Sequence, residues 1–161
     1  MPVLHRLHER PDDENVEELA VFLTACGLPF KKPLRRDRLN AVLTRVRGRP
    51  EEHAVNLAIL KSFKKAVYGP DGSIGHFALN FDRYLHFTSP IRRFPDTHLH
   101  QALEALFAPG AHHLPQKLRK LPPPAGRELA GLGLHTSGRE RRAMEIEEEV
   151  KAFRRLELLF R

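Results

Sequence analysis

Cysteine is almost absent from this chain of 161 residues, which contains only Cys26. A single cysteine can form no internal disulfide and cannot supply the paired ligands of a cysteine-rich zinc site. The sequence also lacks a long apolar run free of charged residues, so nothing in it predicts a transmembrane helix or a signal peptide. We therefore expect a reducing, cytoplasmic setting and no membrane partner.

Acidic residues are fewer than basic ones. The chain has 20 Asp and Glu against 27 Lys and Arg, which gives a formal net charge of +7. This balance favours an anionic partner, and nucleic acid before membrane, because no basic amphipathic anchor rich in aromatic residues stands out. A genome rich in G and C, which favours arginine and proline, would produce a similar bias, so charge alone does not identify the partner.

Three segments of the first half carry apolar residues at helical spacing and end at a breaker. They follow a short extended segment, residues 3–8, and cover residues 11–27, 36–47 and 50–66. Gly27 and Gly48 end the first two helices. In the third, Leu57 and Leu60 extend the apolar face, which predicts burial on more than one side.

The stretch from His76 to His100 has the most unusual composition. Residues 77–81 alternate large and small side chains, which predicts a short strand. Ser89-Pro90 is a helix-start signal, and Pro95 cannot continue a helix begun there. We therefore expect one tight turn over residues 89–94 and a new helix over residues 95–107. Its apolar face is formed by Leu99, Leu103, Leu106 and Phe107.

Two arginines, Arg92 and Arg93, lie between these two helix starts. Helix N-termini favour anions, and arginine can bind a phosphate through two parallel hydrogen bonds, so the pair is a candidate phosphate site. The alternative is that both arginines are surface charges or partners of Asp96. The chemistry of the residues leaves these two interpretations open.

Prolines and glycines dominate residues 108–133, for which we predict an exposed basic loop or a short helical insertion. Within it, His112 and His113 are weak evidence for a metal because no further spaced ligands accompany them. Ser137 precedes Glu140 by three residues, as in a capping box, and so predicts the start of the last helix. That helix carries one apolar stripe, formed by Ala143, Ile146, Val150, Phe153, Leu156 and Phe160.

Two motifs resemble signatures of a known family. The first is the run Tyr84, His86-Phe87-Thr88-Ser89-Pro90-Ile91-Arg92-Arg93, Phe94-Pro95-Asp96 and His100; the second is Ser137 to Ala143 with Glu147 to Val150. Both are similar to the RNB-type catalytic domain of the ribonuclease II and ribonuclease R family, which are processive 3′→5′ exoribonucleases. An earlier segment, from Arg6 to Leu28, is similar as well. The second motif departs from the family pattern at Ile146 and Glu148, which affects the local surface.

The resemblance implies roles for individual residues. Arg92 matches the arginine needed for cleavage, and Glu147 matches an acidic residue that helps to shape the same site, so both are candidate catalytic residues. The candidate RNA-binding residues are Arg93, Tyr84, Ser89 and Arg141. The implied partner is single-stranded RNA, and the implied cofactor of the complete enzyme is Mg²⁺.

The family's metal-binding aspartate cluster has no counterpart in this sequence. We therefore expect residues 1–161 to be the C-terminal part of an RNB-type domain, binding no metal alone, with the missing N-terminal half as a candidate partner. The expected function is a fragment of an exoribonuclease, inactive by itself; the alternative is a non-catalytic RNA-binding or protein-interaction module. The expected fold is α+β and mainly helical, one compact unit of about five helices with one short extended β segment.

Overall fold

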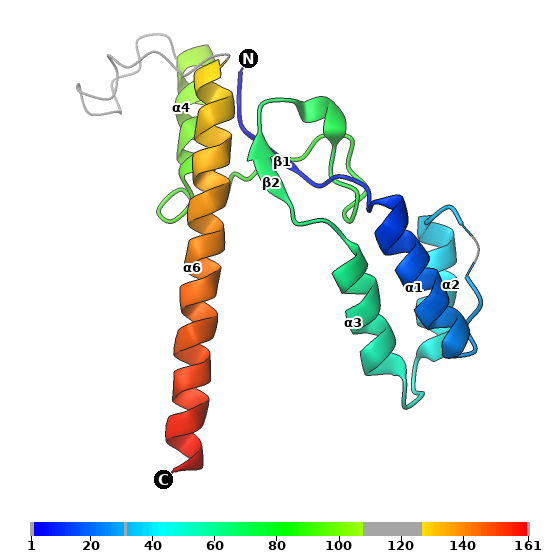
Figure 1. The fold of residues 1–161 in the computed structure, drawn as a ribbon. Coiled ribbons are helices and arrows are strands. Elements are labelled where there is room, and N and C mark those ends of the chain that lie inside the picture. The colour runs from blue at the N-terminus through cyan, green and yellow to red at the C-terminus, as the bar shows by residue number, and fades with distance from the viewer. Residues whose placement is uncertain (1, 31, 108–126, 161) are drawn as a thin grey trace. The chain divides into compact units, whose positions relative to one another are not determined.

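The structure, a computed structural model, describes residues 2–30, 32–107 and 127–160 (Figure 1). Its elements are β1 (His5–Leu7), α1 (Asp13–Ala25), α2 (Arg36–Val46), α3 (Glu52–Ser62), β2 (Val67–Gly69), the 3₁₀ turn η1 (Gly72–Ile74), α4 (Phe94–Phe107) and α6 (Arg127–Leu159). Five α-helices and one two-stranded sheet in this part of the chain confirm the predicted helical α+β fold. None of the described helices has the length and apolar character that a membrane span needs.

The chain divides into two compact units, whereas the sequence led us to expect one. The first unit is Glu9–Lys65 and contains α1, α2 and α3. The second contains β1, β2, α4 and α6, from the described residues of Met1–His8 and Ala66–Arg161. Each unit is considered by itself below.

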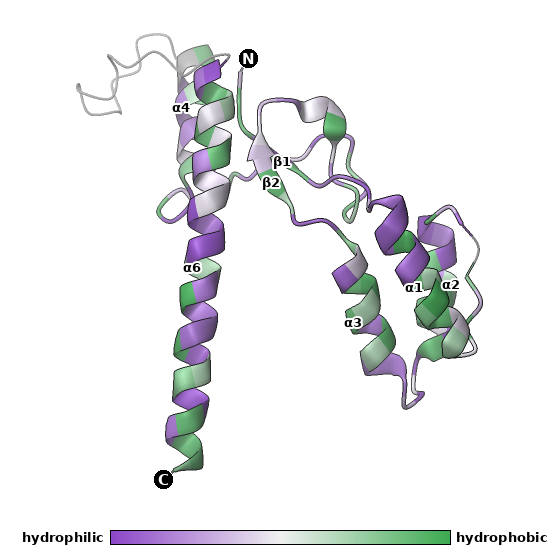
Figure 2. Cartoon of the chain, in the orientation of Figure 1, coloured by the Kyte–Doolittle hydropathy of each residue, from purple (hydrophilic) through white to green (hydrophobic). Residues whose placement is uncertain are grey.

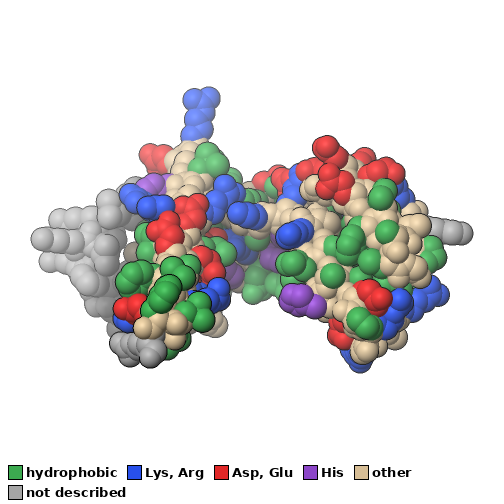
Figure 3. Space-filling view, turned by 60° about the horizontal axis from the view of Figure 1, so that its bottom comes forward, with side chains coloured by type: hydrophobic (Ala, Val, Ile, Leu, Met, Phe, Trp, Pro, Cys, Tyr) green, Lys and Arg blue, Asp and Glu red, His purple; other side chains and the backbone are tan. Residues whose placement is uncertain are grey.

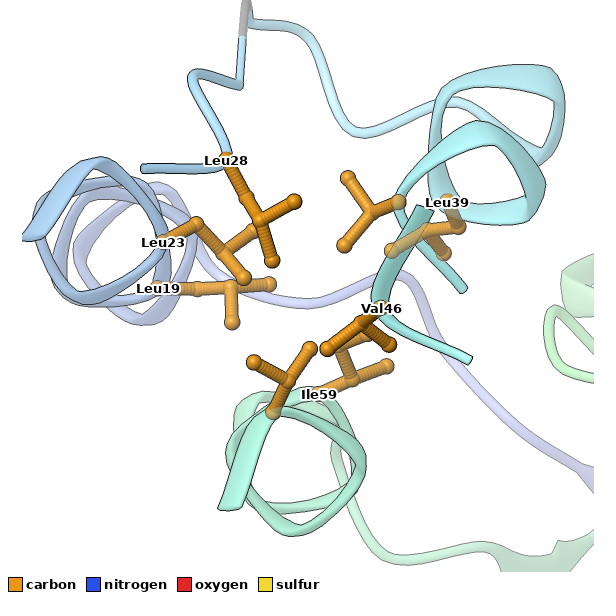
Figure 4. Close-up of a cluster of buried hydrophobic side chains, with 8 residues drawn as sticks. Leu19, Leu23, Leu28, Leu39, Val46 and Ile59 are labelled. Carbon is orange, nitrogen blue, oxygen red and sulfur yellow. The ribbon is translucent and has the colours of Figure 1, made fainter. Parts of the chain in front are cut away.

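The three-helix unit has its own apolar core (Figure 4). Its buried members come from all three helices and from the turn after α1: Leu19, Leu23, Leu28, Leu39, Val42, Val46, Val55 and Ile59. Gly27 and Gly48 both have positive φ, at 70° and 77°, and they follow α1 and α2 as predicted. A glycine adopts this conformation without the steric cost that other residues incur.

One prediction about α3 is wrong. Leu57 and Leu60 have exposed fractions of 44% and 65%, so this helix is buried on one side only. The buried residues of this helix recur at helical spacing and so lie on one face: Val55, Ile59 and Ser62. Leu57 points away from that row because two residues along a helix turn the side chain by about 200°.

The second unit contains the antiparallel sheet. β1 pairs with β2 so that Arg6 lies opposite Tyr68, and the predicted extended segment at residues 3–8 is confirmed by β1. The strand predicted at residues 77–81 is wrong, because this segment is a turn. His76 donates a backbone hydrogen bond to Phe81 (2.8 Å) and accepts one from it (3.3 Å), while Asn80 has a φ of 59°. The chain therefore reverses inside a segment whose side-chain alternation resembled a strand.

Helix α6 begins at Arg127 and not at Ser137. Residues 127–133 of the predicted loop are thus helical, while residues 108–126 lie outside the described residues. Ser137 does not cap the helix: its Oγ donates to the Gly133 carbonyl and accepts the backbone N–H of Tyr68, both at 2.8 Å. A Cβ on Gly133 would lie 2.5 Å from the Tyr68 carbonyl oxygen. Gly133 and Ser137 are therefore the surface on which α6 contacts β2.

Helix α4 also differs from its predicted face at one end. Leu99 and Ala102 are buried against Val3, but Leu106 and Phe107 in the last turn are exposed. In α6, Figure 2 shows polar and apolar residues mixed along the C-terminal half of the helix. Helical periodicity alone did not reveal where the packing of each helix stops.

Candidate functional site

The turn before α4 is fixed by hydrogen bonds from both sides. The Ser89 carbonyl accepts the backbone N–H groups of Arg92 (3.3 Å) and Arg93 (3.0 Å). In the first turns of α4, Asp96 Oδ1 accepts the Ser89 backbone N–H at 2.8 Å, and Thr97 Oγ1 donates to the Pro90 carbonyl at 2.7 Å. The predicted order, a tight turn followed by a new helix, is confirmed; α4 begins at Phe94.

Asp96 holds Arg93 but not Arg92. The Asp96 side chain is fully buried, and its Oδ1 lies 2.8 Å from Arg93 Nη2. Burial alone would raise the pKa of Asp96, but the Ser89 hydrogen bond and the Arg93 guanidinium outweigh it, so the pKa lies below its usual value. Arg92 is exposed, and its side chain has no hydrogen-bond or ion-pair partner among the described residues.

A groove of about 700 Å³ lies beside this turn, within the second unit. Its lining comes from β2, the turn, the start of α4 and one face of α6: Tyr68, Arg92, Arg93, Phe94, Pro95, Leu132, His135, Thr136, Arg139, Glu140, Ala143, Met144 and Glu147. The residues from α6 recur at intervals of three and four, which places them on one side of that helix.

The charges that line the groove fall into two classes. Arg93, Glu140 and Glu147 are engaged with neighbouring charges. Glu140 accepts a hydrogen bond from Arg6 at 2.6 Å, and Glu147 lies 2.7 Å from Lys151 Nζ. Arg92 and Arg139 have no side-chain partner in the described part of the chain. The charge left over is positive, and two guanidinium groups suit the oxygens of a phosphate.

Tyr68 forms a neutral, packed part of the groove wall. The Arg6 guanidinium lies over its ring, 4.6 Å from the centroid, and its hydroxyl lies 2.8 Å from His86 Nδ1. Burial raises the pKa of Tyr68 and lowers the pKa of His86. Both groups are then neutral at pH 7, and the tautomer of His86 sets which of the two atoms donates this hydrogen bond.

The structure brings together three of the six residues singled out from the sequence. Arg92, Arg93 and Glu147 line the groove; the other three are not among its lining residues. Tyr84 stacks on Phe81, with ring centroids 5.7 Å apart. The backbone of Ser89 belongs to the turn, and Arg141 lies on another side of α6. Their contacts with RNA remain predictions.

Sequence reasoning missed Arg139 as a groove residue and selected Arg141 instead. Both belong to the same basic cluster, so composition could not separate them. Helical spacing could have done so, because Arg139 lies four residues before Ala143 and eight before Glu147. Arg141 is rotated by about 200° from Arg139 around the helix axis.

The carboxylates of the described residues do not form a magnesium site. No three His, Cys, Asp or Glu side chains of this part of the chain are arranged to hold a metal ion. The two carboxylates of the groove are each paired with a cation, Glu140 with Arg6 and Glu147 with Lys151. Mg²⁺ prefers several oxygen ligands, with one or two carboxylates among them. The residues do not fit this cofactor, and we derive no chemical step through it.

The chain is similar to ribonucleases. The RNB domain family matches residues 1–109. Ribonuclease R of Thermotoga maritima is 32% identical over 163 residues, covering 100% of this chain and 22% of that protein; for ribonuclease R of Escherichia coli the values are 34%, 92% and 19%. The chain thus spans about a fifth of the length of these curated relatives.

A solved structure has the same fold. Mycoplasma genitalium RNase R in complex with ribose methylated single-stranded RNA superposes with a TM-score of 0.76 at 22% identity, over 95% of this chain and 24% of that one. The fold likeness agrees with the family match, which covers the turn before α4 and the two arginines that follow Ser89-Pro90. The chain therefore belongs to the RNB domain family, as its resemblance to ribonucleases II and R predicted.

Proposed function

We propose that this chain forms an RNA-contacting part of a ribonuclease R-type 3′→5′ exoribonuclease. In this proposal the groove between the Ser89–Arg93 turn and α6 holds the phosphates of single-stranded RNA. One observation carries the proposal: Arg92 and Arg139 line one groove, and neither has a side-chain partner among the described residues. Family membership and the net charge of +7 support it. The Mycoplasma relative that shares the fold was solved with RNA.

Arg92 has the central part in this proposal. Hydrogen bonds from Asp96 and Thr97 to the backbone of Ser89 and Pro90 fix the turn that carries Arg92, and its guanidinium extends from this fixed backbone to the groove. A planar guanidinium can bind two phosphate oxygens at once and stabilise charge that develops on them. Glu147 has a positioning role, because a carboxylate on the wall repels phosphate and restricts where the strand lies.

Hydrolysis itself needs groups that the described residues do not assemble. The family's Mg²⁺ would supply an activated water when bound in the complete enzyme, and its ligands would come from the N-terminal half of the domain. We propose that this half is the partner that completes the site. The chain's own contribution is to bind and orient the RNA.

The test measures the binding of a fluorescein-labelled single-stranded oligoribonucleotide to the full chain by fluorescence anisotropy, at several salt concentrations. Replacing Arg92 or Arg139 with Gln should weaken binding and reduce the magnitude of the logarithmic salt slope by about 0.7 for each lost phosphate contact. Arg45→Gln changes the same charge on α2, in the other unit, and should leave both quantities close to those of the original chain. Equal effects at all three positions would overturn the groove as the binding site.

A second function, a non-catalytic RNA-binding module, is favoured by one observation. The groove carboxylates are ion-paired, and the described residues form no metal-ligand group. Such a module would use the same groove and the same arginines. The two functions differ in whether RNA is shortened when the rest of the domain is supplied.

A further inference from the structure

Two histidines of the second unit hold the turn over residues 76–81 through their side chains. His8 Nδ1 accepts the backbone N–H of Ala78 at 3.0 Å, and His76 Nδ1 accepts the backbone N–H of Leu79 at 3.3 Å. The two donors are consecutive backbone groups of the turn. One acceptor directly follows β1 and the other begins the turn, so the two side chains connect the turn to β1.

Backbone hydrogen bonds place the two histidines side by side. The His8 backbone N–H donates to the Gly75 carbonyl at 3.0 Å, and the His8 carbonyl accepts the N–H of Phe77 at 2.8 Å. The two imidazole rings are tilted, with centroids 4.9 Å apart. His8 is 6% exposed and His76 is half-buried. On the face shown in Figure 3, histidine occupies little of the surface between charged and hydrophobic side chains. Charge on a shielded imidazole is poorly solvated.

The hydrogen-bond donors define the tautomer of both rings. A backbone amide can only donate, so each Nδ1 must offer a lone pair, and each neutral ring must carry its proton on Nε2. A proton on Nδ1 would place two N–H donors opposite each other and remove the hydrogen bond. These two contacts between side chain and turn therefore exist only while the imidazoles are neutral.

The surroundings of the pair favour the neutral state. Burial lowers the pKa of His76, and positive charge on His8 and Arg6 lowers it further; a hydrogen bond with its own backbone acts in the opposite direction and is outweighed. The His76 ring also faces Tyr84 edge-on, with centroids 5.2 Å apart, and the His8 ring faces Phe77 at 6.3 Å. Among the described residues, the charges that act on His76 are thus both positive.

We infer that His8 and His76 act as a pH-dependent switch, which holds the turn over residues 76–81 against the end of β1 while both imidazoles are neutral and releases it when they are protonated. The turn carries Phe81, whose ring stacks on Tyr84. Release therefore removes a support of Tyr84, one of the residues predicted to contact RNA. The switch itself does not depend on that role, because neither histidine lines the groove.

Hydrogen exchange of the isotope-labelled full chain, followed by NMR, tests the switch at its two amides. The Tyr68 amide, which donates to Ser137 Oγ in the same unit, serves as the reference for general loss of stability. Between pH 7.5 and pH 5.5, and after correction for intrinsic exchange rates, protection of the Ala78 and Leu79 amides should fall by a factor of about three to ten more than that of Tyr68. Equal falls at all three amides would overturn the inference.

Substitutions separate the hydrogen bonds from the titration. The double variant His8→Asn, His76→Asn keeps an acceptor oxygen at the δ position of each side chain but cannot take up a proton at these pH values, so protection of Leu79 should follow the Tyr68 reference at both. His76→Leu removes the acceptor and should lower the protection of Leu79 even at pH 7.5. His53→Asn, at an exposed position of α3, should keep the original response. A pH response of Leu79 that persists in the double variant would contradict the switch.

A measurement on the original chain requires no variant. Long-range nitrogen–proton NMR spectra distinguish the two neutral tautomers of histidine. At pH 7.5, His8 and His76 should both carry the proton on Nε2. If either ring carries it on Nδ1 instead, that ring cannot accept its backbone amide and the inference fails.

Discussion

Two buried polar residues of α4 behave very differently although they are only two positions apart. Asp96 accepts hydrogen bonds from Ser89 and Arg93. His98 is 1% exposed, and neither of its ring nitrogens has a hydrogen-bond partner in the described part of the chain. Burial lowers the pKa of His98 below its usual value of 6.5. The folded chain therefore holds this imidazole neutral, at the cost of two unsatisfied polar atoms.

Acid should destabilise the second unit through this histidine. Because the pKa of His98 is lower in the folded chain than the unfolded value of 6.5, the unfolded chain binds more protons below that pH. His98 therefore costs the folded chain no stability through protonation above pH 6.5, and it lowers the free energy of unfolding increasingly as the pH falls below 6.5. Burial also lowers the pKa values of His5, His76 and His86, so they act in the same direction.

We predict that His98→Leu raises the free energy of unfolding by about 1 kcal/mol at pH 7.5, because an apolar side chain leaves no unsatisfied polar atom. The gain should be larger at pH 5.5, where the original chain loses stability. Urea unfolding at both pH values measures it. His53→Leu, at an exposed position of α3, is the control and should change the pH dependence very little. An unchanged pH dependence in His98→Leu would show that other groups cause the acid sensitivity.

At the scale of elements, the contact between α6 and β2 depends on glycine at position 133, which has no side chain. Gly133 brings the helix so close to β2 that a Cβ there would also lie 3.2 Å from the Gly69 Cα. All three atoms nearest to this Cβ, the carbonyl oxygen and carbon of Tyr68 and the Gly69 Cα, are backbone atoms, so relief of the overlap requires moving a whole element. Gly131 lies two residues earlier in the same helix, and nothing lies within 4 Å of a Cβ built there.

We predict opposite effects of alanine at these two positions. Gly131→Ala should stabilise the chain by about 0.5–1 kcal/mol, because alanine has the higher helix propensity. Gly133→Ala gains the same propensity but must separate α6 from β2, so it should destabilise the chain by about 1–3 kcal/mol. Thermal and urea unfolding of the two variants decide between these signs. Stabilisation by both would mean that the close approach at Tyr68 relaxes without cost.

The sequence predicted elements well where a local signal ends them. Glycines with positive φ follow α1 and α2, and Pro95 lies in the first turn of α4, so these helices could be identified from local chemistry. The strand at residues 77–81 and the start of α6 could not. Short alternation does not separate a strand from a turn, and the contact that favours glycine at position 133 comes from Tyr68, 65 positions away in the chain.

The candidate site was predictable to a similar degree. Arg92, Arg93 and Glu147 were selected through family resemblance, and the structure places all three on one groove. Arg139 was missed, because its place in the groove lining depends on which face of α6 lies on the side of Tyr68. Charge pairing was only half predictable: Asp96 was a candidate partner of both arginines, and the structure gives it to Arg93.

At the scale of the whole molecule, the groove belongs to one of two compact units. All of its lining residues lie in the unit of β1, β2, α4 and α6, while Glu9–Lys65 has a separate core. The arginines that would contact phosphate in the proposed function therefore all belong to this second unit. Under the proposed function, RNA binding and hydrolysis can be tested separately, because the groove residues supply cations whereas the described carboxylates form no metal-ligand group.

We predict that the chain alone binds single-stranded RNA in a salt-sensitive way but does not shorten it in the presence of Mg²⁺. Arginine can stabilise charge on a phosphate, but it cannot generate the attacking hydroxide, which a metal-bound water held by carboxylate ligands would supply. The assay follows a 3′-tailed RNA on a denaturing gel, with the chain alone and with a protein that carries the acidic N-terminal half of an RNB domain. Shortening only in the mixture would support the split exoribonuclease, whereas binding without shortening in either sample would favour the non-catalytic module. Processive shortening by the chain alone would contradict the prediction, and the glutamates at positions 145–149 would then be the first residues to test as metal ligands.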